Sequence, residues 1–291
     1  MNPYLDAKPW RAALVWLPMA LHPLDSAAAP SDAEPPGKVT SNASDSSSIE
    51  VPRKEATTVP AHMKDRGPEN TQRAFVDTVL PLVLLENERI EGKRKKMEQL
   101  FSRLELGSAL DGNERDWLRS LAAEYRVDGD PLRETSARKE LRARVDIVPA
   151  DLAIAQAATE TGWGVSRAAH RDRDLFGMTA IPTRTIKTAS GKRIHAPRFD
   201  NLRESVRTYI HNLNSHVAYS PLRTIRAKLR TERKPIQGTV VAEGLVKYSQ
   251  RGKAYVKQVR SIIQDHGLGR YVNARLMPGR DQMAYATGVS P

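Results

Sequence analysis

The stretch Ala153–Gly177, AIAQAATETGWGVSRAAHRDRDLFG, carries the strongest pattern in the chain. Its first half predicts an apolar helix, because small and apolar residues with good helix propensity follow one another without a helix breaker. One acid, Glu160, then stands shortly before Gly162–Trp163–Gly164. Glycine ends helices and leaves room beside a neighbouring ring. The stretch therefore predicts a buried helix that ends in a single carboxylate, with an indole close by.

The spacing within this stretch indicates a possible catalytic acid. Gln156 and Glu160 are four residues apart and share a helix face, and Trp163 follows three residues later. A carboxyl group sheltered by apolar neighbours has a raised pKa, which a general acid working near neutral pH requires. A surface glutamate beside a core tryptophan is the alternative, and the short motif alone leaves it open.

The longer string from residue 148 to 178, VPADLAIAQAATETGWGVSRAAHRDRDLFGM, resembles the glucosaminidase family of flagellar-rod peptidoglycan hydrolases and bacterial autolysins. In that family a small apolar helix ends in an acid, then a small residue, Ser or Gly, Trp and Gly. An NLFG element follows a short basic loop and here reads Asp174–Gly177. Between Phe75 and His266, four more segments are similar to the Bax branch of this family: FVDTVLPLVLLENERI, WLRSLAAEYRV, RESVRTYIHNLNSHVAYSPLR and AEGLVKYSQRGKAYVKQVRSII.

The resemblance implies a lysozyme-like α+β fold, mostly helical, with a small β-lobe beside a groove. The implied reaction is hydrolysis of the β-1,4 bond after N-acetylglucosamine in peptidoglycan, as an endo-β-N-acetylglucosaminidase. Glu160 falls on the family's catalytic acid, and Tyr248 lies where relatives carry a tyrosine associated with the active site. The candidate substrate-binding residues, some of which could equally serve the core, are Gln156, Trp163, Phe176 and Tyr219.

A second catalytic carboxyl group is harder to assign. Glycoside hydrolysis normally uses two carboxyl groups, and many relatives carry the second in the β-lobe. The segment 183–199, TRTIKTASGKRIHAPRF, predicts that lobe as a β-hairpin but contains no acid. The acids nearest to the motif in sequence are Asp172, Asp174, Asp200 and Glu204. Asp174 replaces the family's usual asparagine and is expected to be structural.

Three functions stay open at this point. The first is the hydrolase, with help from the substrate's N-acetyl group or from a polar residue that positions water. The second is a lytic transglycosylase, which can work with a single Glu. The third is a cell-wall binding or scaffold protein without turnover.

Helical periodicity predicts the rest of the folded part. The expected helices lie within 71–105, 113–127, 128–145, 201–230 and 239–267. Pro81 is expected to kink or divide the first helix, and Asn113 to cap the second. Leu202, Val206, Tyr209, Ile210 and Leu213 are expected to form one buried stripe.

The N-terminal region predicts export. Lys8 and Arg11 precede a short apolar run at 12–21 and small residues near Ala28, the pattern of a secretory signal. We expect a signal peptide or N-terminal membrane anchor at 1–29, a disordered Pro- and Ser-rich linker at 30–70, the glucosaminidase domain at 71–270 and an irregular tail at 271–291. The expected location is the periplasm or the cell exterior.

Charge and composition narrow the possible partners. The 291 residues carry a formal net charge of +12, which favours a polyanionic partner. No helix-turn-helix or aromatic-rich β-platform accompanies this charge, so we expect no nucleic-acid partner and assign the charge to the carboxylates of peptidoglycan. The absence of cysteine excludes thiolate zinc sites and disulfides. The histidines lack metal-ligand spacing, and we expect neither metal nor cofactor.

Overall fold

The computed structural model describes residues 48–178, 185–187, 193–195 and 198–279. The expected signal peptide or anchor, the linker residues 30–47, the hairpin loop and the tail beyond residue 279 lie outside the described residues.

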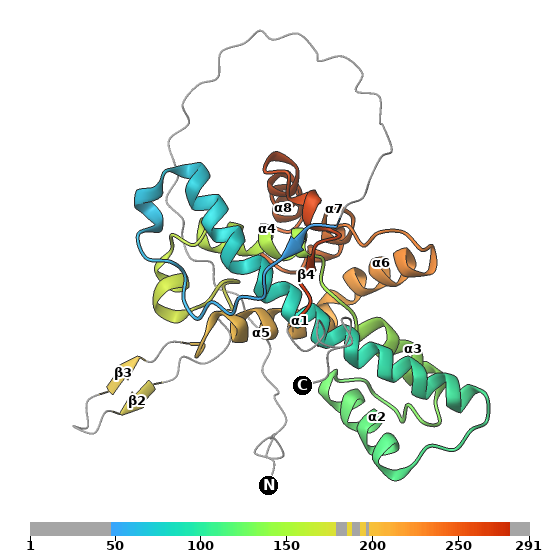
Figure 1. The fold of residues 1–291 in the computed structure, drawn as a ribbon. Coiled ribbons are helices and arrows are strands. Elements are labelled where there is room, and N and C mark those ends of the chain that lie inside the picture. The colour runs from blue at the N-terminus through green and yellow to red at the C-terminus, as the bar shows by residue number, and fades with distance from the viewer. Residues whose placement is uncertain (1–47, 179–184, 188–192, 196–197, 280–291) are drawn as a thin grey trace, which may run out of the picture.

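The described chain is mostly helical, as expected for a lysozyme-like α+β domain (Figure 1). Its α-helices are α1 (Pro68–Glu105), α2 (Gly112–Glu124), α3 (Thr135–Arg144), α4 (Ala150–Thr161), α5 (Leu202–Ser215), α6 (Ser220–Thr231), α7 (Gly238–Val241) and α8 (Lys253–Asp265). Shorter helical turns are η1 (Met63–Arg66), the π-helical η2 (Ala168–Asp172), η3 (Val217–Tyr219), η4 (Ala242–Leu245) and η5 (Leu268–Tyr271). The strands are β1 (Glu50–Val51), β2 (Thr185–Lys187), β3 (Arg193–His195) and β4 (Arg275–Leu276).

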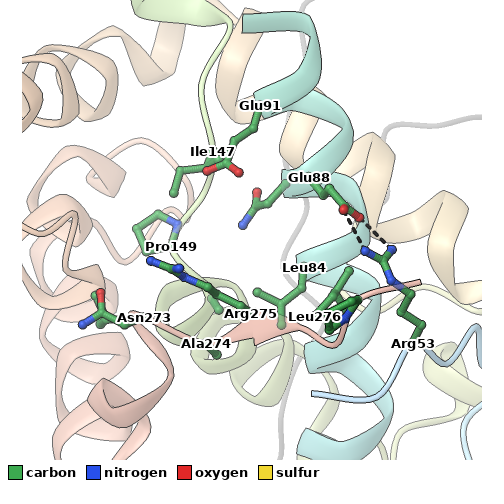
Figure 2. Close-up of a pocket in the computed structure, with 14 residues that line it drawn as sticks. Arg53, Leu84, Glu88, Glu91, Ile147, Pro149, Asn273, Ala274, Arg275 and Leu276 are labelled. Carbon is green, nitrogen blue, oxygen red and sulfur yellow. Dashed lines mark hydrogen bonds and ion pairs between the residues drawn. The ribbon is translucent and has the colours of Figure 1, made fainter. Parts of the chain in front are cut away.

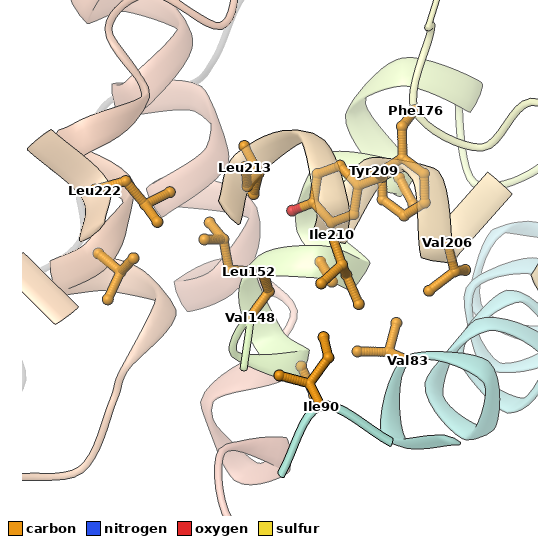
Figure 3. Packing of buried hydrophobic residues seen from close by; sticks show 14 of the residues in the cluster. Val83, Ile90, Val148, Leu152, Phe176, Val206, Tyr209, Ile210, Leu213 and Leu222 are labelled. Carbon is orange, nitrogen blue, oxygen red and sulfur yellow. The ribbon is translucent and has the colours of Figure 1, made fainter. Parts of the chain in front are cut away.

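Helix α4 lies at the centre of the fold. Every residue from Ala150 to Ala158 is buried, and the helix packs against α1, α7 and α8. Figure 3 shows Leu152 of α4 among side chains from α1 and α5, including Ile90 and Ile210. A helix that is apolar on all sides is stable only in such a position. The helix that carries Glu160 is therefore held from several directions.

Helix α1 is continuous for 38 residues, with Pro81 inside it. Of the two expected effects of Pro81, a kink or a division of the helix, the division does not occur. Proline removes one backbone donor, which leaves the carbonyl four residues earlier without its helical partner. That residue is the exposed Asp77, while Leu80, Leu82 and Val83 around Pro81 are buried. Burial of this apolar face compensates for the lost hydrogen bond.

The N-cap of α2 is Asp111, not Asn113. Asp111 Oδ1 accepts a hydrogen bond from the backbone N–H of Glu114 at 2.8 Å, and the Glu114 side chain accepts from the Asp111 N–H at 3.0 Å. This reciprocal pair satisfies two backbone donors at once, whereas a cap at Asn113 would have started the helix later.

The predicted buried stripe of α5 is confirmed, because all five of its residues are buried. Glu86 of α1, which is fully buried, accepts hydrogen bonds from Arg89 of its own helix and from Arg203 and Arg207 of α5. These three guanidinium groups lower the pKa of Glu86 against the opposing effect of its burial. The ion pairs fix α5 on α1.

The predicted hairpin is confirmed. Strands β2 and β3 pair antiparallel, with Ile186 opposite Ile194. In Figure 1 the pair projects from the helical body beside α5. It is the small β-lobe that the family resemblance implies.

Both expected domain boundaries differ from the structure. Strand β1 pairs in parallel with β4, and Val59 and Met63 are buried in the core. Ordered chain thus reaches into the expected linker as far as residue 48, and into the expected irregular tail as far as residue 279. A two-residue strand pair between opposite ends of a chain has no local periodicity, so the sequence gives no sign of it.

Candidate active site

The two glycines after Glu160 end helix α4. Gly162 is the C-cap in the left-handed conformation (φ 58°, ψ 50°), as expected for a helix-ending glycine. The backbone N–H of Trp163 donates to Ala158 O at 3.2 Å, and that of Gly164 donates to Thr161 Oγ1 at 2.9 Å. These bonds hold the last turn closed. Glu160 therefore projects from a fixed helix end.

Burial gives Glu160 the ionisation of a general acid. Removal of water from around the carboxyl group raises its pKa from 4.5 to about 7, and the negative charge of Asp174 acts in the same direction. The Tyr255 hydroxyl donates to Glu160 Oε1 at 2.9 Å and opposes this rise, as does the charge of Arg251. The balance leaves the group able to hold a proton near neutral pH.

A directed chain of hydrogen bonds ends at Glu160. Tyr209 Oη donates to Gln156 Oε1 at 2.8 Å, and Gln156 Nε2 donates to Tyr255 Oη at 3.0 Å. Burial raises the pKa of both tyrosines well above 10, so both stay protonated. A hydroxyl has one proton, and Tyr255 uses its proton toward Oε1 of Glu160. When Glu160 is protonated, its proton consequently sits on Oε2.

Oε2 lies against the backbone of the loop that follows η2. Gly177 has φ +61°, and a Cβ added to it would lie 2.9 Å from Glu160 Oε2. The loop is fixed by Asp174, which accepts from the Phe176 N–H at 3.1 Å and pairs with Arg198 at 2.7 Å. Asp174 is thus a structural residue, as expected. The position of Gly177 favours glycine, because a side chain is strained at this φ and its Cβ would force the Glu160 carboxyl group to shift.

Three of the four candidate substrate-binding residues are part of the core. Gln156 is wholly buried, and the Phe176 ring stacks on Tyr209 with 3.8 Å between centroids. Tyr219 is 3% exposed, and its ring lies 5.9 Å from that of Tyr248. In this structure they support the Glu160 environment from behind, and their assignment to substrate contact stays a prediction. Core and groove residues have the same spacing along a helix, which is why the sequence did not separate them.

Tyr248 contacts the loop backbone. Its hydroxyl donates to Phe176 O at 3.0 Å, and its ring stacks on Tyr255 with 5.3 Å between centroids. The hydroxyl group that hydrogen-bonds Glu160 belongs to Tyr255. The two tyrosines lie seven residues apart in one segment, and no sequence pattern distinguishes them.

Trp163 packs on the body of the protein. Its ring meets Phe75 of α1 edge-on at 5.9 Å and His266 at 4.7 Å, and it remains partly exposed. A Cβ on Gly164 would lie 2.8 Å from the Phe75 ring. Gly164 therefore makes room for Phe75, which in turn supports the indole. Of the two expectations for Trp163, core support is the one that these contacts favour.

The remaining candidate acids have other contacts. The Glu204 side chain accepts from the backbone N–H of Asp200 at 2.7 Å at the start of α5, and Asp172 accepts from the Phe199 N–H through its backbone carbonyl rather than its carboxylate. Among the side chains that the structure describes, none of these carboxylates has a hydrogen bond to Glu160. In the same residues no group of three or more His, Cys, Asp or Glu side chains could hold a metal ion.

Comparison with known proteins covers most of the folded chain. Residues 135–268 match the family model described as Glucosaminidase, mannosyl-glycoprotein endo-beta-N-acetylglucosaminidase. The protein bax of Escherichia coli (strain K12) is 33% identical over 195 residues, which are 67% of this chain and 69% of that protein. No solved structure matches the chain. The family match includes Glu160, Gly177 and Tyr255.

Proposed function

Because the chain belongs to the glucosaminidase family, we propose that it hydrolyses the β-1,4 bond after N-acetylglucosamine in peptidoglycan, with Glu160 as the general acid. Family membership supports a glycosidase with a peptidoglycan-type substrate. The observation that carries the finer proposal is the Glu160 carboxyl group itself. Its pKa is raised to about 7, and one of its oxygens is held by a tyrosine hydroxyl.

Proton transfer follows from this geometry. Glu160 donates the proton on Oε2 to the glycosidic oxygen, and the bond between that oxygen and the anomeric carbon breaks. Water, directly or after assistance by the substrate's N-acetyl oxygen, bonds to the anomeric carbon, and the proton that it loses restores the acid form of Glu160. The negative charge left on Glu160 is stabilised by the hydrogen bond from Tyr255 and by the positive charge of Arg251. Tyr255 acts as a positioning residue, because it fixes the carboxyl group and directs the proton to the oxygen beside Gly177.

A lytic transglycosylase is the second candidate. The observation in its favour is the absence of any acid in the hairpin segment 183–199. By the family resemblance, many members carry a second glutamate there. A transglycosylase would form a 1,6-anhydro sugar from the substrate's own hydroxyl group, so it needs no carboxylate to activate water. Both candidates use Glu160 as the acid.

Mass analysis of digested peptidoglycan tests the proposal. The chain from residue 48 onward is incubated with purified peptidoglycan, and the soluble products are analysed. We expect fragments that end in reducing N-acetylglucosamine from the wild type and from Glu69→Gln, an exposed charge-matched control. We expect none from Glu160→Gln. Anhydro products would replace the hydrolase by the transglycosylase. Binding to peptidoglycan without release would indicate a cell-wall scaffold, and full activity of Glu160→Gln would refute the acid assignment.

We also propose that the protein is exported to the periplasm or the cell exterior, with membrane association through its N-terminus. The support is the sequence pattern of residues 1–29. Among the described residues, no helix combines the length and the apolar character that a membrane span needs. Fractionation of cells that express the full chain, followed by N-terminal sequencing, separates a cleaved signal from a retained anchor.

A further inference from the structure

A cavity of about 530 Å³ lies at the other end of helix α4 from Glu160. Four segments that are remote in sequence line it: the chain after β1, the middle of α1, the entry to α4 and the chain around β4 (Figure 2). Pro149 and Ala150, where α4 begins, form part of its wall. The tertiary fold alone creates this site.

One pair of charges in the cavity is already satisfied. Arg53 donates two hydrogen bonds to the Glu88 carboxylate, at 2.8 and 2.7 Å, and a third to Met277 O at 2.8 Å. This bidentate pair joins the chain after β1 to α1 and to the chain after β4. It acts as a fixed wall of the cavity, with no charge left over for a ligand.

Two further charges of opposite sign face the cavity without such a partner. Glu91 of α1 and Arg275 of β4 have no side-chain hydrogen bond or ion pair within the described residues. Neighbouring protein removes part of the hydration of Glu91 and raises its pKa. The positive charges of Arg230 and Arg275 oppose this rise, and the negative charges of Asp146 and Glu88 add to it. A bound cation would relieve both effects, since it favours the ionised carboxylate.

The surface between these two charges is apolar. Leu84, Ile147 and Pro149 line the cavity, and Figure 2 shows Ile147 and Pro149 between Glu91 and Arg275, with Leu84 beside Leu276. Small-molecule sites typically combine such an apolar lining with a few convergent polar groups. A ligand that fits this arrangement has one positive and one negative end, separated by an apolar part.

We propose that this cavity binds a short zwitterionic peptide or amino acid, with its ammonium group on Glu91 and its carboxylate on Arg275. A guanidinium group matches a carboxylate with two parallel hydrogen bonds, and a carboxylate accepts readily from an ammonium group. The side-chain amide of Asn273, also at the cavity wall, offers a further donor and acceptor.

The stem peptide of peptidoglycan has this chemistry, because it carries a free amino group on its diamino acid and a terminal carboxylate. This identification of the ligand rests on the proposed function. Helix α4 has 12 residues, so it spans about 18 Å between the cavity and the end that carries Glu160. The straight line between the two runs through the core, because every residue from Ala150 to Ala158 is buried, so the peptide in the cavity need not belong to the glycan strand at Glu160.

Titration calorimetry with ligands that contain no glycosidic bond tests the site separately from catalysis. The probes are free diaminopimelate, a stem tripeptide that ends in diaminopimelate, and the same tripeptide with its amino groups acetylated. We expect saturable binding of an unmodified probe to the full chain, and a loss of about tenfold or more in affinity with Glu91→Gln, with Arg275→Gln and on acetylation. Glu69→Gln and Arg73→Gln, matched exposed changes on α1, should bind as the wild type does.

Each outcome has a definite meaning. Binding of the tripeptide alone supports the stem peptide as the source of the ligand, and equal binding of diaminopimelate supports a free amino acid. Absence of binding at millimolar concentration, or affinity unchanged in both Glu91→Gln and Arg275→Gln, refutes the site. Peptidoglycan digestion in that case would leave the proposed function intact, whereas binding without digestion would overturn the function and retain the site.

Discussion

Replacement of Glu160 by glutamine should abolish glycosidase activity and, at the same time, stabilise the protein in a pH-dependent way. The wild-type carboxyl group is largely desolvated, so its ionised form is unfavourable in the folded state. Glutamine has the same shape and no charge. Its oxygen can still accept the hydrogen bond from Tyr255, which keeps the surrounding hydrogen bonds in place.

The size of the effect follows from the raised pKa. The folded-state pKa is about 7 against 4.5 for the exposed group, and one pH unit corresponds to about 1.4 kcal/mol, which gives about 3.4 kcal/mol as an upper bound. Below pH 4.5 both states are protonated, and the variant should have the wild-type free energy of unfolding. As the pH rises from 4.5 to 7, the wild type loses this stability and the variant does not.

Urea denaturation at a series of pH values between 4 and 8.5 measures this difference. The difference between the two proteins at each pH isolates Glu160, because Asp151, whose pKa burial raises to about 6, contributes equally to both. We expect the stabilisation by glutamine to grow from near zero at pH 4 to about 2–3 kcal/mol at pH 8, with an unchanged dependence on urea. A difference that is constant with pH, or a variant less stable at pH 8, would refute the buried, protonated carboxyl group.

Three further substitutions test the surroundings of the site and the core. Tyr255→Phe removes the donor to Glu160 Oε1, so the Glu160 pKa should rise further. The alkaline limb of the pH–rate profile should then move to higher pH by about one unit, and kcat should fall roughly tenfold. An alkaline limb that does not move would contradict the positioning role of Tyr255. Gly177→Ala should lower the free energy of unfolding by about 1–2 kcal/mol and kcat by about a hundredfold, since the added Cβ would lie 2.9 Å from Glu160 Oε2. A variant with wild-type kcat would show that the loop is free to shift. Glu86→Ala should lower the free energy of unfolding by about 3 kcal/mol at pH 7. The loss should be smaller at low pH, because the pKa of Glu86 is lowered in the folded state and its ion pairs are lost when it is protonated. If the denaturation midpoint falls by the same amount at every pH, the side chain contributes through packing alone.

The place of Glu160 in the fold was largely predictable from the sequence. An apolar run followed by one acid and two glycines predicted a buried helix that ends at the acid, because the apolar faces need cover and glycine ends a helix. The hairpin and the stripe of α5 were predictable for the same reason, since each depends on a periodicity of two or of 3.6 residues.

The partners of Glu160 were decided by the tertiary structure. The packing of α8 against α4 decides that Tyr255, and not Tyr248, contacts the carboxyl group. The two tyrosines are too close in sequence for a sequence pattern to tell them apart. The placement of Gly177 against Oε2 depends likewise on the ion pair between Asp174 and Arg198 across the hairpin.

The cavity and the pairing of the chain ends are decided in the same way. Glu50 lies beside Arg275, and the two are more than two hundred residues apart in sequence. The periodicity of a segment predicts which of its residues are buried. It contains no information about which remote segment covers them, since any apolar face of similar size would serve. The sequence of this protein therefore determined where its acid lies, and the tertiary structure decided what holds that acid and what lies at the other end of its helix.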